Sequence, residues 1–153
     1  MIRLLLFLAV LIPVPVISQD YINKNRNQVK KELKNIKPPG KDASVHLSET
    51  DSSLVLTIKG PGNSAADFIY EFGKSDTCRL EKVVAGCKAC FTRYLEEALS
   101  KPVYNWKKLN ENQYISGFDS RRMLELPVDG QSYTFRIFRL DWTREMYDLL
   151  SGQ

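Results

Sequence analysis

Three consecutive stretches between residues 43 and 72 alternate apolar and polar side chains with a period of two. Such alternation puts every apolar side chain on one face of an extended strand, so each stretch predicts a half-buried β-strand. Residues 50–53 and 60–63 separate the stretches and are rich in turn-forming types. The pattern therefore predicts a three-stranded antiparallel meander. Its alternating apolar positions are Ala43, Val45, Leu47, Leu54, Leu56, Ile58, Phe68, Tyr70 and Phe72.

Residues 80–99 change to helical spacing and give the strongest helix signal in the chain, with Pro102 just beyond its end. Gly86 lies inside this segment and weakens a continuous helix. The alternative is a division at Gly86, with a strand before it and a shorter helix after it.

Helices are also predicted at both ends of the rest of the chain. Residues 20–37 carry a narrow apolar stripe, with Asp20 as a candidate N-cap, and the prolines of 38–40 end the helix. Asp141 is a candidate cap for a short last helix that carries Trp142 and Met146.

The remaining segments again have strand character, at 103–109, 113–118, 122–126 and 132–140. Asp129-Gly130 is a hairpin signal between the last two of them. Strands and helices do not alternate as in a parallel sheet. We therefore expect an α+β fold, with an antiparallel sheet of about six or seven strands, one main helix packed on it, and N-terminal and C-terminal helices.

The first 18 residues have the layout of a secretory signal peptide, with a charged start, a short apolar run and the small residue Ser18. A membrane anchor is the alternative, but the run is roughly 14 residues and spanning needs about 20. We expect cleavage before Gln19, a basic segment at 19–41 and a single domain at 42–153. The mature protein is predicted to be secreted, or lumenal in the secretory pathway, and not to span a membrane.

Positive charge is concentrated in the segment 19–41, although the whole chain has a formal net charge of only +4. The rest of the mature chain is close to neutral, which argues against a nucleic-acid-binding domain. A basic arm can meet an acidic protein or an anionic surface, or can simply be a solvated helix face. The residues of this basic arm are Lys24, Arg26, Lys30, Lys31, Lys34 and Lys37.

Cys78, Cys87 and Cys90 are the three cysteines of the chain. An odd number in an oxidising compartment predicts one bridge and one free or intermolecular thiol, so a disulfide-linked homodimer is one expectation. A bridge between Cys78 and Cys87 requires the division at Gly86, whereas Cys87 and Cys90 could meet on one helical turn. Redox chemistry at the C-x-x-C spacing is disfavoured if the pair lies on the apolar face of a long helix, without a strand and turn before it.

Other catalytic patterns are weak. His46 is the single histidine, and no nucleophile motif accompanies it. Neither a metal nor another cofactor is expected. The sequence therefore favours a secreted, non-enzymatic protein that binds a protein partner or an anionic surface. The alternatives are an extracellular carrier of a small apolar ligand, held between the helix of 80–99 and the sheet, and a secreted hydrolase that uses carboxylates.

Overall fold

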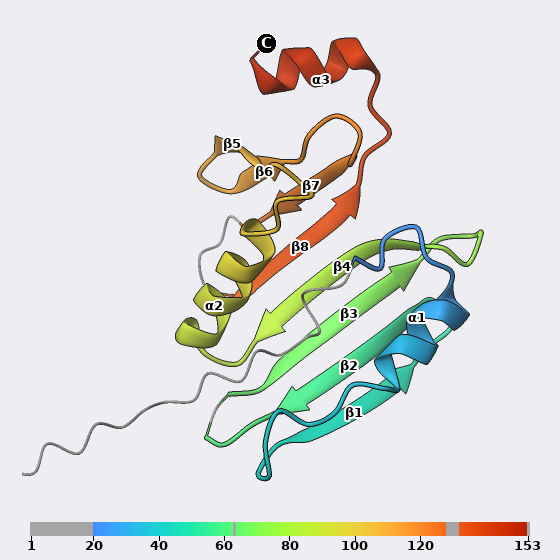
Figure 1. Cartoon of the computed structure of the whole chain (residues 1–153), viewed down its shortest axis with the longest axis vertical. Coiled ribbons are helices and arrows are strands. Elements are labelled where there is room, and N and C mark those ends of the chain that lie inside the picture. The colour runs from blue at the N-terminus through green and yellow to red at the C-terminus, as the bar shows by residue number, and fades with distance from the viewer. Residues whose placement is uncertain (1–19, 63, 128–131, 153) are drawn as a thin grey trace, which may run out of the picture.

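The computed structural model describes residues 20–62, 64–127 and 132–152. It shows one antiparallel sheet of eight strands in the order β1-β2-β3-β4-β8-β7-β6-β5 (Figure 1). The predicted α+β class is confirmed, and the sheet has more strands than the six or seven expected. The strands are β1 (Ser44–Glu49), β2 (Ser53–Lys59), β3 (Ala66–Phe72), β4 (Cys78–Ala85), β5 (Lys107–Asn110), β6 (Gln113–Ile115), β7 (Arg122–Glu125) and β8 (Thr134–Arg139). The helices are α1 (Arg26–Leu33), α2 (Lys88–Leu99) and α3 (Arg144–Ser151).

The meander predicted from the period-two pattern is present as β1, β2 and β3. Leu56 of β2 lies opposite Leu47 on one side and Phe68 on the other. The inward side chains of β2 are almost completely buried. Alternation therefore located these strands correctly, because one face of each is covered and the other is not.

Residues 78–99 form a strand followed by a helix, so a single helix over 80–99 is wrong and the division at Gly86 is right. β4 pairs with β3 and β8, and Val83 lies between Phe68 and Phe135. These two neighbours come from distant parts of the chain, and their ladder hydrogen bonds override the local helical spacing. The side chain of Cys87 accepts the N–H of Cys90 and so caps α2 at its start.

The sheet has a separate apolar cluster on each face. Leu124 of β7 belongs to the main core, which α1 and α2 cover. Its neighbour Met123 points to the opposite face and packs in a second cluster with Trp142 and Tyr147, beside α3. α1 and α2 thus lie on one side of the sheet, and α3 covers the other side at its β5–β7 end (Figure 1).

The N-terminal helix is shorter than the expected 20–37. α1 begins after Asn25, which forms a capping box with Gln28. The residues before it form a turn that distant partners hold: the N–H of Asn23 donates to the carbonyl of Cys78 at 2.9 Å. Asp20 is therefore not a helix cap. Val29 and Leu33 of α1 are buried in the main core.

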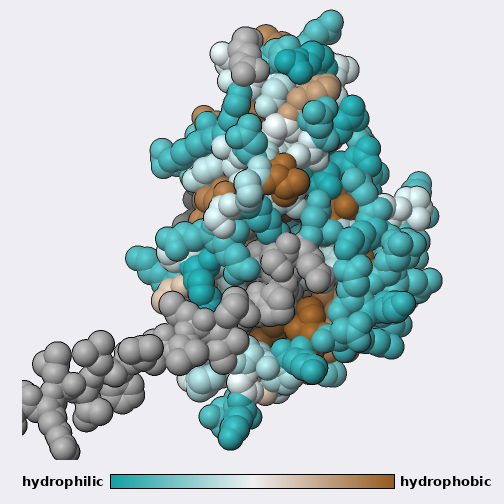
Figure 2. Space-filling model, viewed as in Figure 1, coloured by the Kyte–Doolittle hydropathy of each residue, from teal (hydrophilic) through white to brown (hydrophobic). Residues whose placement is uncertain are grey.

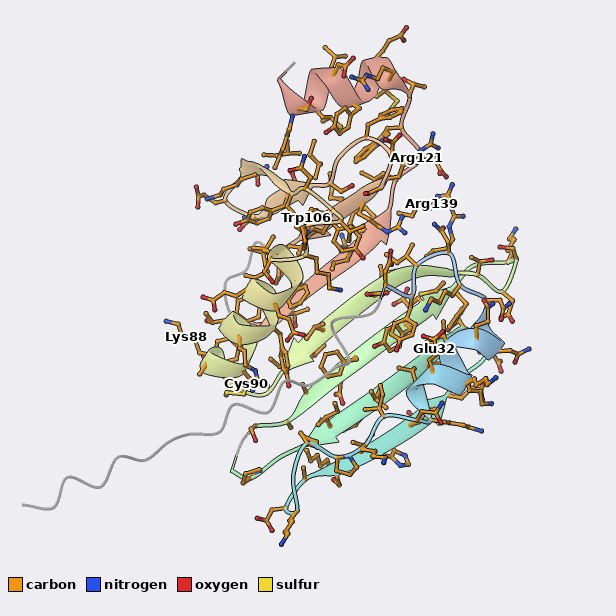
Figure 3. The ribbon with its side chains drawn as sticks, viewed as in Figure 1. Glu32, Lys88, Cys90, Trp106, Arg121 and Arg139 are labelled. Atoms are coloured by element: carbon orange, nitrogen blue, oxygen red, sulfur yellow. A yellow bond between two sulfur atoms is a disulfide. The ribbon has the colours of Figure 1, made fainter. Side chains whose placement is uncertain are left out.

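The last helix also starts later than expected. Thr143 caps α3, and Asp141 instead forms ion pairs with Arg79 and Arg139. Figure 3 labels Arg139, the last residue of β8. The hairpin turn predicted at Asp129-Gly130 and the signal peptide of residues 1–18 lie outside the described residues.

Candidate functional site

The outward face of the central strands is a part of the described sheet against which neither apolar cluster packs. The side chains on it are apolar, polar and charged, and none of the apolar ones belongs to either core cluster. We call this surface the open face. It consists of Val55, Thr57, Asp67, Ile69, Glu71, Leu80, Lys82, Val84, Thr134, Arg136 and Phe138.

Two cations lie directly opposite each other at the centre of the open face. Lys82 of β4 is the cross-strand partner of Arg136 of β8. Like charges in such positions repel each other and destabilise a sheet. Arg136 forms an ion pair with Glu125, whose carboxylate also accepts a hydrogen bond from Gln113. No described carboxylate forms an ion pair with Lys82, although Asp67 and Glu71 of β3 lie diagonally beside it on the same face.

Two hollows border this pair of cations. One has a volume of about 390 Å³ and is lined by Phe72, Leu80, Arg136 and Phe138, among others. The other has a volume of about 480 Å³, and Lys82, Val84 and Arg136 are among its lining residues. Arg136 therefore borders both hollows. A ligand with an anionic group at the two cations can therefore place its neighbouring side chains in the hollows on either side.

The covered face contains an unexpected carboxylate. Glu81 points inward between Tyr70 and Ile137, where neighbouring positions are apolar. Its Oε1 accepts a hydrogen bond of 2.7 Å from the backbone N–H of Tyr21. Loss of water around the side chain, with a smaller contribution from the charge of Asp20, raises the pKa of Glu81 to about 7. Perturbed carboxyl groups of this kind are common at functional sites but also occur in structural networks.

Other polar side chains gather around Glu81. Asp20 Oδ2 lies 3.2 Å from Nη2 of Arg122, whose side chain is only 6% exposed. Tyr104 forms a side-chain hydrogen bond with Asp20, and burial raises the pKa of its hydroxyl. Burial also lowers the pKa of Lys101. This polar cluster, Asp20, Glu81, Lys101, Tyr104 and Arg122, joins the start of the described chain to the sheet.

The space beside the polar cluster is small. Phe68, Tyr70, Glu81, Lys101 and Phe135 line a cavity of about 20 Å³. This volume is close to the minimum needed for a single water molecule. The tightly packed region gives no support to the carrier hypothesis, which requires room for an apolar ligand between the helix and the sheet.

The basic arm is largely part of the folded body. Arg26 pairs with Asp76, donates to the carbonyls of Thr50 and Asp51, and lies over the ring of Phe72. Lys24 pairs with Glu32, which Figure 3 labels on α1, and Lys30 pairs with Glu49. Among the described residues, the lysines of the arm with exposed side chains and no ion pair are Lys31, Lys34 and Lys37. Hydrophilic side chains dominate the surface around α1 (Figure 2).

The structure assigns different environments to the three cysteines. Cys87 and Cys90 form a disulfide at the first turn of α2, and Cys78 is free and completely buried. Its burial leaves its sulfur no route to a second chain, so the structure does not support the disulfide-linked homodimer. The sequence disfavours redox chemistry only on the assumption of a long helix with no strand and turn before the C-x-x-C pair. That assumption is wrong, because β4 ends at Ala85 and α2 begins only at Lys88.

No protein-family model, curated protein or solved structure shows a significant match to this chain. Within the described residues, no group of three or more His, Cys, Asp or Glu side chains could hold a metal ion. No helix of the described part is long and apolar enough to cross a membrane. His46 is exposed on β1 at the edge of the sheet, opposite Thr57.

The sequence reasoning did not identify the open face or the polar cluster. A signal for Glu81 existed: once 78–85 is treated as a strand, Glu81 falls on the same side as Val83 and Ala85. A charged residue at an inward position is unusual unless it has a partner. The pairing of Lys82 with Arg136 depends on the register between strands separated by about 50 residues, which local patterns do not reveal.

Proposed function

We propose that the mature protein is a secreted, non-enzymatic binding protein whose open face engages a protein partner. The observation that carries the proposal is the pairing of Lys82 with Arg136 among partly exposed apolar side chains. Like charges directly opposite each other are unfavourable in a sheet, and the ion pair of Arg136 with Glu125 offsets part of this repulsion. Local arrangements that work against stability occur chiefly at functional positions. The partner is a polypeptide that presents a carboxylate flanked by apolar side chains.

The properties of the open face agree with those of known interfaces. Stable interfaces bury about 800 Å² on each partner, and the central part of a sheet face can supply an area of this order. Arginine and aromatic side chains carry much of the binding energy at such surfaces, and here Arg136 and Phe138 border the same hollow. Charges at the rim mainly accelerate association and make it sensitive to salt.

The direct test compares three immobilised baits in the fluid into which the protein is secreted. They are the wild type, the double variant Lys82→Glu/Arg136→Glu, and the control Lys31→Glu/Lys34→Glu, which reverses two exposed charges on the other face. We expect one polypeptide to be retained by the wild type and the control and to bind the open-face variant at least tenfold more weakly. A photo-crosslinker in place of Ile69 should join to an acidic segment of that polypeptide.

Two outcomes would overturn the proposal. Equal retention by all three baits would show that the open face is not the binding surface. Loss of binding only in the α1 variant would transfer the function to the basic arm. Vesicles containing anionic lipid provide the corresponding test for a membrane surface, and binding to them that depends on Lys31 and Lys34 would favour the arm.

A further inference from the structure

The Cys87–Cys90 disulfide lies where the chain leaves β4 and enters α2. Gly86 forms the junction, and its N–H donates to the carbonyl of Ala65 at 2.7 Å. The N–H of Ala85 donates to the carbonyl of Tyr133 at 2.8 Å. These bonds fix the backbone immediately before Cys87. The disulfide is therefore presented on a well-anchored turn at the start of a helix of 12 residues.

The two sulfur atoms differ in their surroundings. Cys87 is the N-cap residue, and its Sγ lies 3.0 Å from the N–H of Cys90, which can donate to it. The residues around it, Gly86, Lys88 and Ala89, are exposed, and Figure 3 shows Lys88 directed away from the sheet. Cys90 instead packs against the main core. Both cysteines are half-buried, and the exposed neighbours of Cys87 place the open side of the bridge at Cys87 rather than at Cys90.

Several features favour a thiolate at Cys87 once the bridge is opened. The N-terminus of α2 carries partial positive charge, and the first turn contains no acidic residue. Lys88 adds a full positive charge beside it. The N–H of Cys90 can remain a donor to the sulfur after reduction. Helix N-termini and nearby cations are the environments that lower cysteine pKa values and make a thiol reactive.

A purely structural role explains the bridge less well. The stabilisation that a disulfide gives by restricting the unfolded chain grows with the loop that it closes. This bridge closes a sequence separation of only three residues. The backbone on either side of the pair is already held by the sheet and the helix.

We infer that Cys87–Cys90 is an exchangeable disulfide that oxidises the two thiols of a polypeptide substrate, with Cys87 as the attacked sulfur. A substrate thiolate attacks Cys87 Sγ, the bond between the two sulfurs breaks, and Cys90 leaves with the electron pair. The second substrate thiolate then attacks the substrate sulfur of the mixed disulfide and releases Cys87. The substrate loses two electrons and two protons to form its disulfide, and the protein becomes the dithiol. The exchange is stoichiometric, because the protein ends as the dithiol, so it is a property separate from binding at the open face and not a catalytic turnover.

The test uses the processed full chain and a reduced synthetic peptide with two cysteines. The oxidised wild type should convert one equivalent of peptide to its disulfide, at a rate at least about tenfold above that of oxidised glutathione at equal concentration. The double variant Cys87→Ser/Cys90→Ser should show no transfer. A wild-type rate no faster than glutathione would overturn the proposal.

Single variants test the assignment of the attacked sulfur. Serine is a preferred N-cap residue, so Cys87→Ser keeps the start of α2 intact. In Cys90→Ser, the alkylation of Cys87 by iodoacetamide should have a pH midpoint at least about one unit below the ordinary cysteine value of roughly 8.5. In Cys87→Ser, Cys90 should be alkylated at least tenfold more slowly at pH 7. A Cys87 midpoint at 8.5 or above, or equal alkylation rates, would contradict the inference, and circular dichroism verifies that both variants are folded.

Discussion

Glu81 Oε1 accepts a 2.7 Å hydrogen bond from the backbone N–H of Tyr21, a residue 60 positions earlier in the chain. The bond joins the first described residues to the middle of the sheet. It also explains why a carboxylate is tolerated on an otherwise apolar face, since a buried acceptor needs a donor. The same contact shows that residues 20–22 belong to the folded body.

Replacing Glu81 by Gln should remove one component of the pH dependence of stability. The folded-state pKa is raised from the ordinary 4.5 to about 7, so the folded protein keeps a proton that the unfolded chain releases. This contribution is fully present below pH 4.5 and is lost as the pH rises to about 7, by at most about 3 kcal/mol. Glu81→Gln should therefore match the wild type at pH 4.5 and exceed it at pH 8 in urea unfolding.

The exposed Glu96 of α2 provides the matched control for this experiment. Glu96→Gln should leave the difference between pH 4.5 and pH 8 unchanged. If Glu81→Gln has the same pH profile as the wild type, the carboxyl group of Glu81 does not titrate as inferred.

Replacing Arg122 by Ala should cost about 2 kcal/mol of folding stability, because it removes a side chain that is only 6% exposed and its charged hydrogen bond with Asp20, whose side chain is 36% exposed. Arg122 Nη1 also donates to the carbonyl of Ser120 at 2.8 Å, and that bond is lost as well. Arg144→Ala is the control, because its side chain is 64% exposed in an ion pair with Asp148 and the change should cost no more than about 1 kcal/mol. Equal costs for the two changes, measured by urea unfolding, would contradict the structural role of Arg122.

Replacing Lys82 by Glu should leave the protein at least as stable as the wild type while weakening binding to the partner. The change converts a repulsive cross-strand pair with Arg136 into an attractive one, worth roughly 0.2–1 kcal/mol. Thermal unfolding and bait retention measure the two effects. If Lys82→Glu is clearly less stable than the wild type, Lys82 supports the fold. The like-charge pair with Arg136 would then be no evidence of function.

The basic arm must be tested by changing charges rather than by deleting it. Removal of residues 20–41 would take Tyr21, Ile22, Val29 and Leu33 out of the core, and the truncated chain should not fold. Leu33→Ala alone should cost about 2–5 kcal/mol. Replacing Lys31, Lys34 and Lys37 together by Gln should change stability by no more than about 0.5 kcal/mol, because these side chains lie on the surface. Urea unfolding of the two variants distinguishes the core face of α1 from its solvated face.

The parts of the fold that were predictable are those where local pattern and tertiary environment agree. β2 and β3 alternate cleanly because one of their faces is buried. The segment around Glu81 was misassigned because Leu80, Val83 and Val84 happen to fit a helical period, while the β8 partner lies about 50 residues later. α1 was predicted too long because the side chain that holds Asp20 outside the helix is that of Arg122, 102 positions away.

The candidate sites were harder to predict than the fold, because they depend even more on pairing between strands that are distant in the sequence. The three cysteines were recognised as important from their number, but their spacing left both Cys78–Cys87 and Cys87–Cys90 open, and only the burial of Cys78 in β4 decides between them. The open face required the register of β4 against β8, because nothing local places Lys82 beside Arg136. Sequence reasoning could therefore identify reactive residue types but not the surfaces on which they meet.

The number of thiols that react with a reagent tests the fold around Cys78. Burial raises the pKa of this thiol, and its Sγ lies 3.6 Å from the carbonyl of Leu80 as a weak donor. Burial keeps this thiol protonated and unreactive. The native oxidised protein should therefore react with no equivalent of Ellman's reagent at pH 8 and with one equivalent in 6 M guanidinium chloride. Rapid labelling of the native protein, or a dimer on a non-reducing gel that disappears in Cys78→Ala, would show that Cys78 is accessible and that the packing of β4 against the segment 20–25 is wrong.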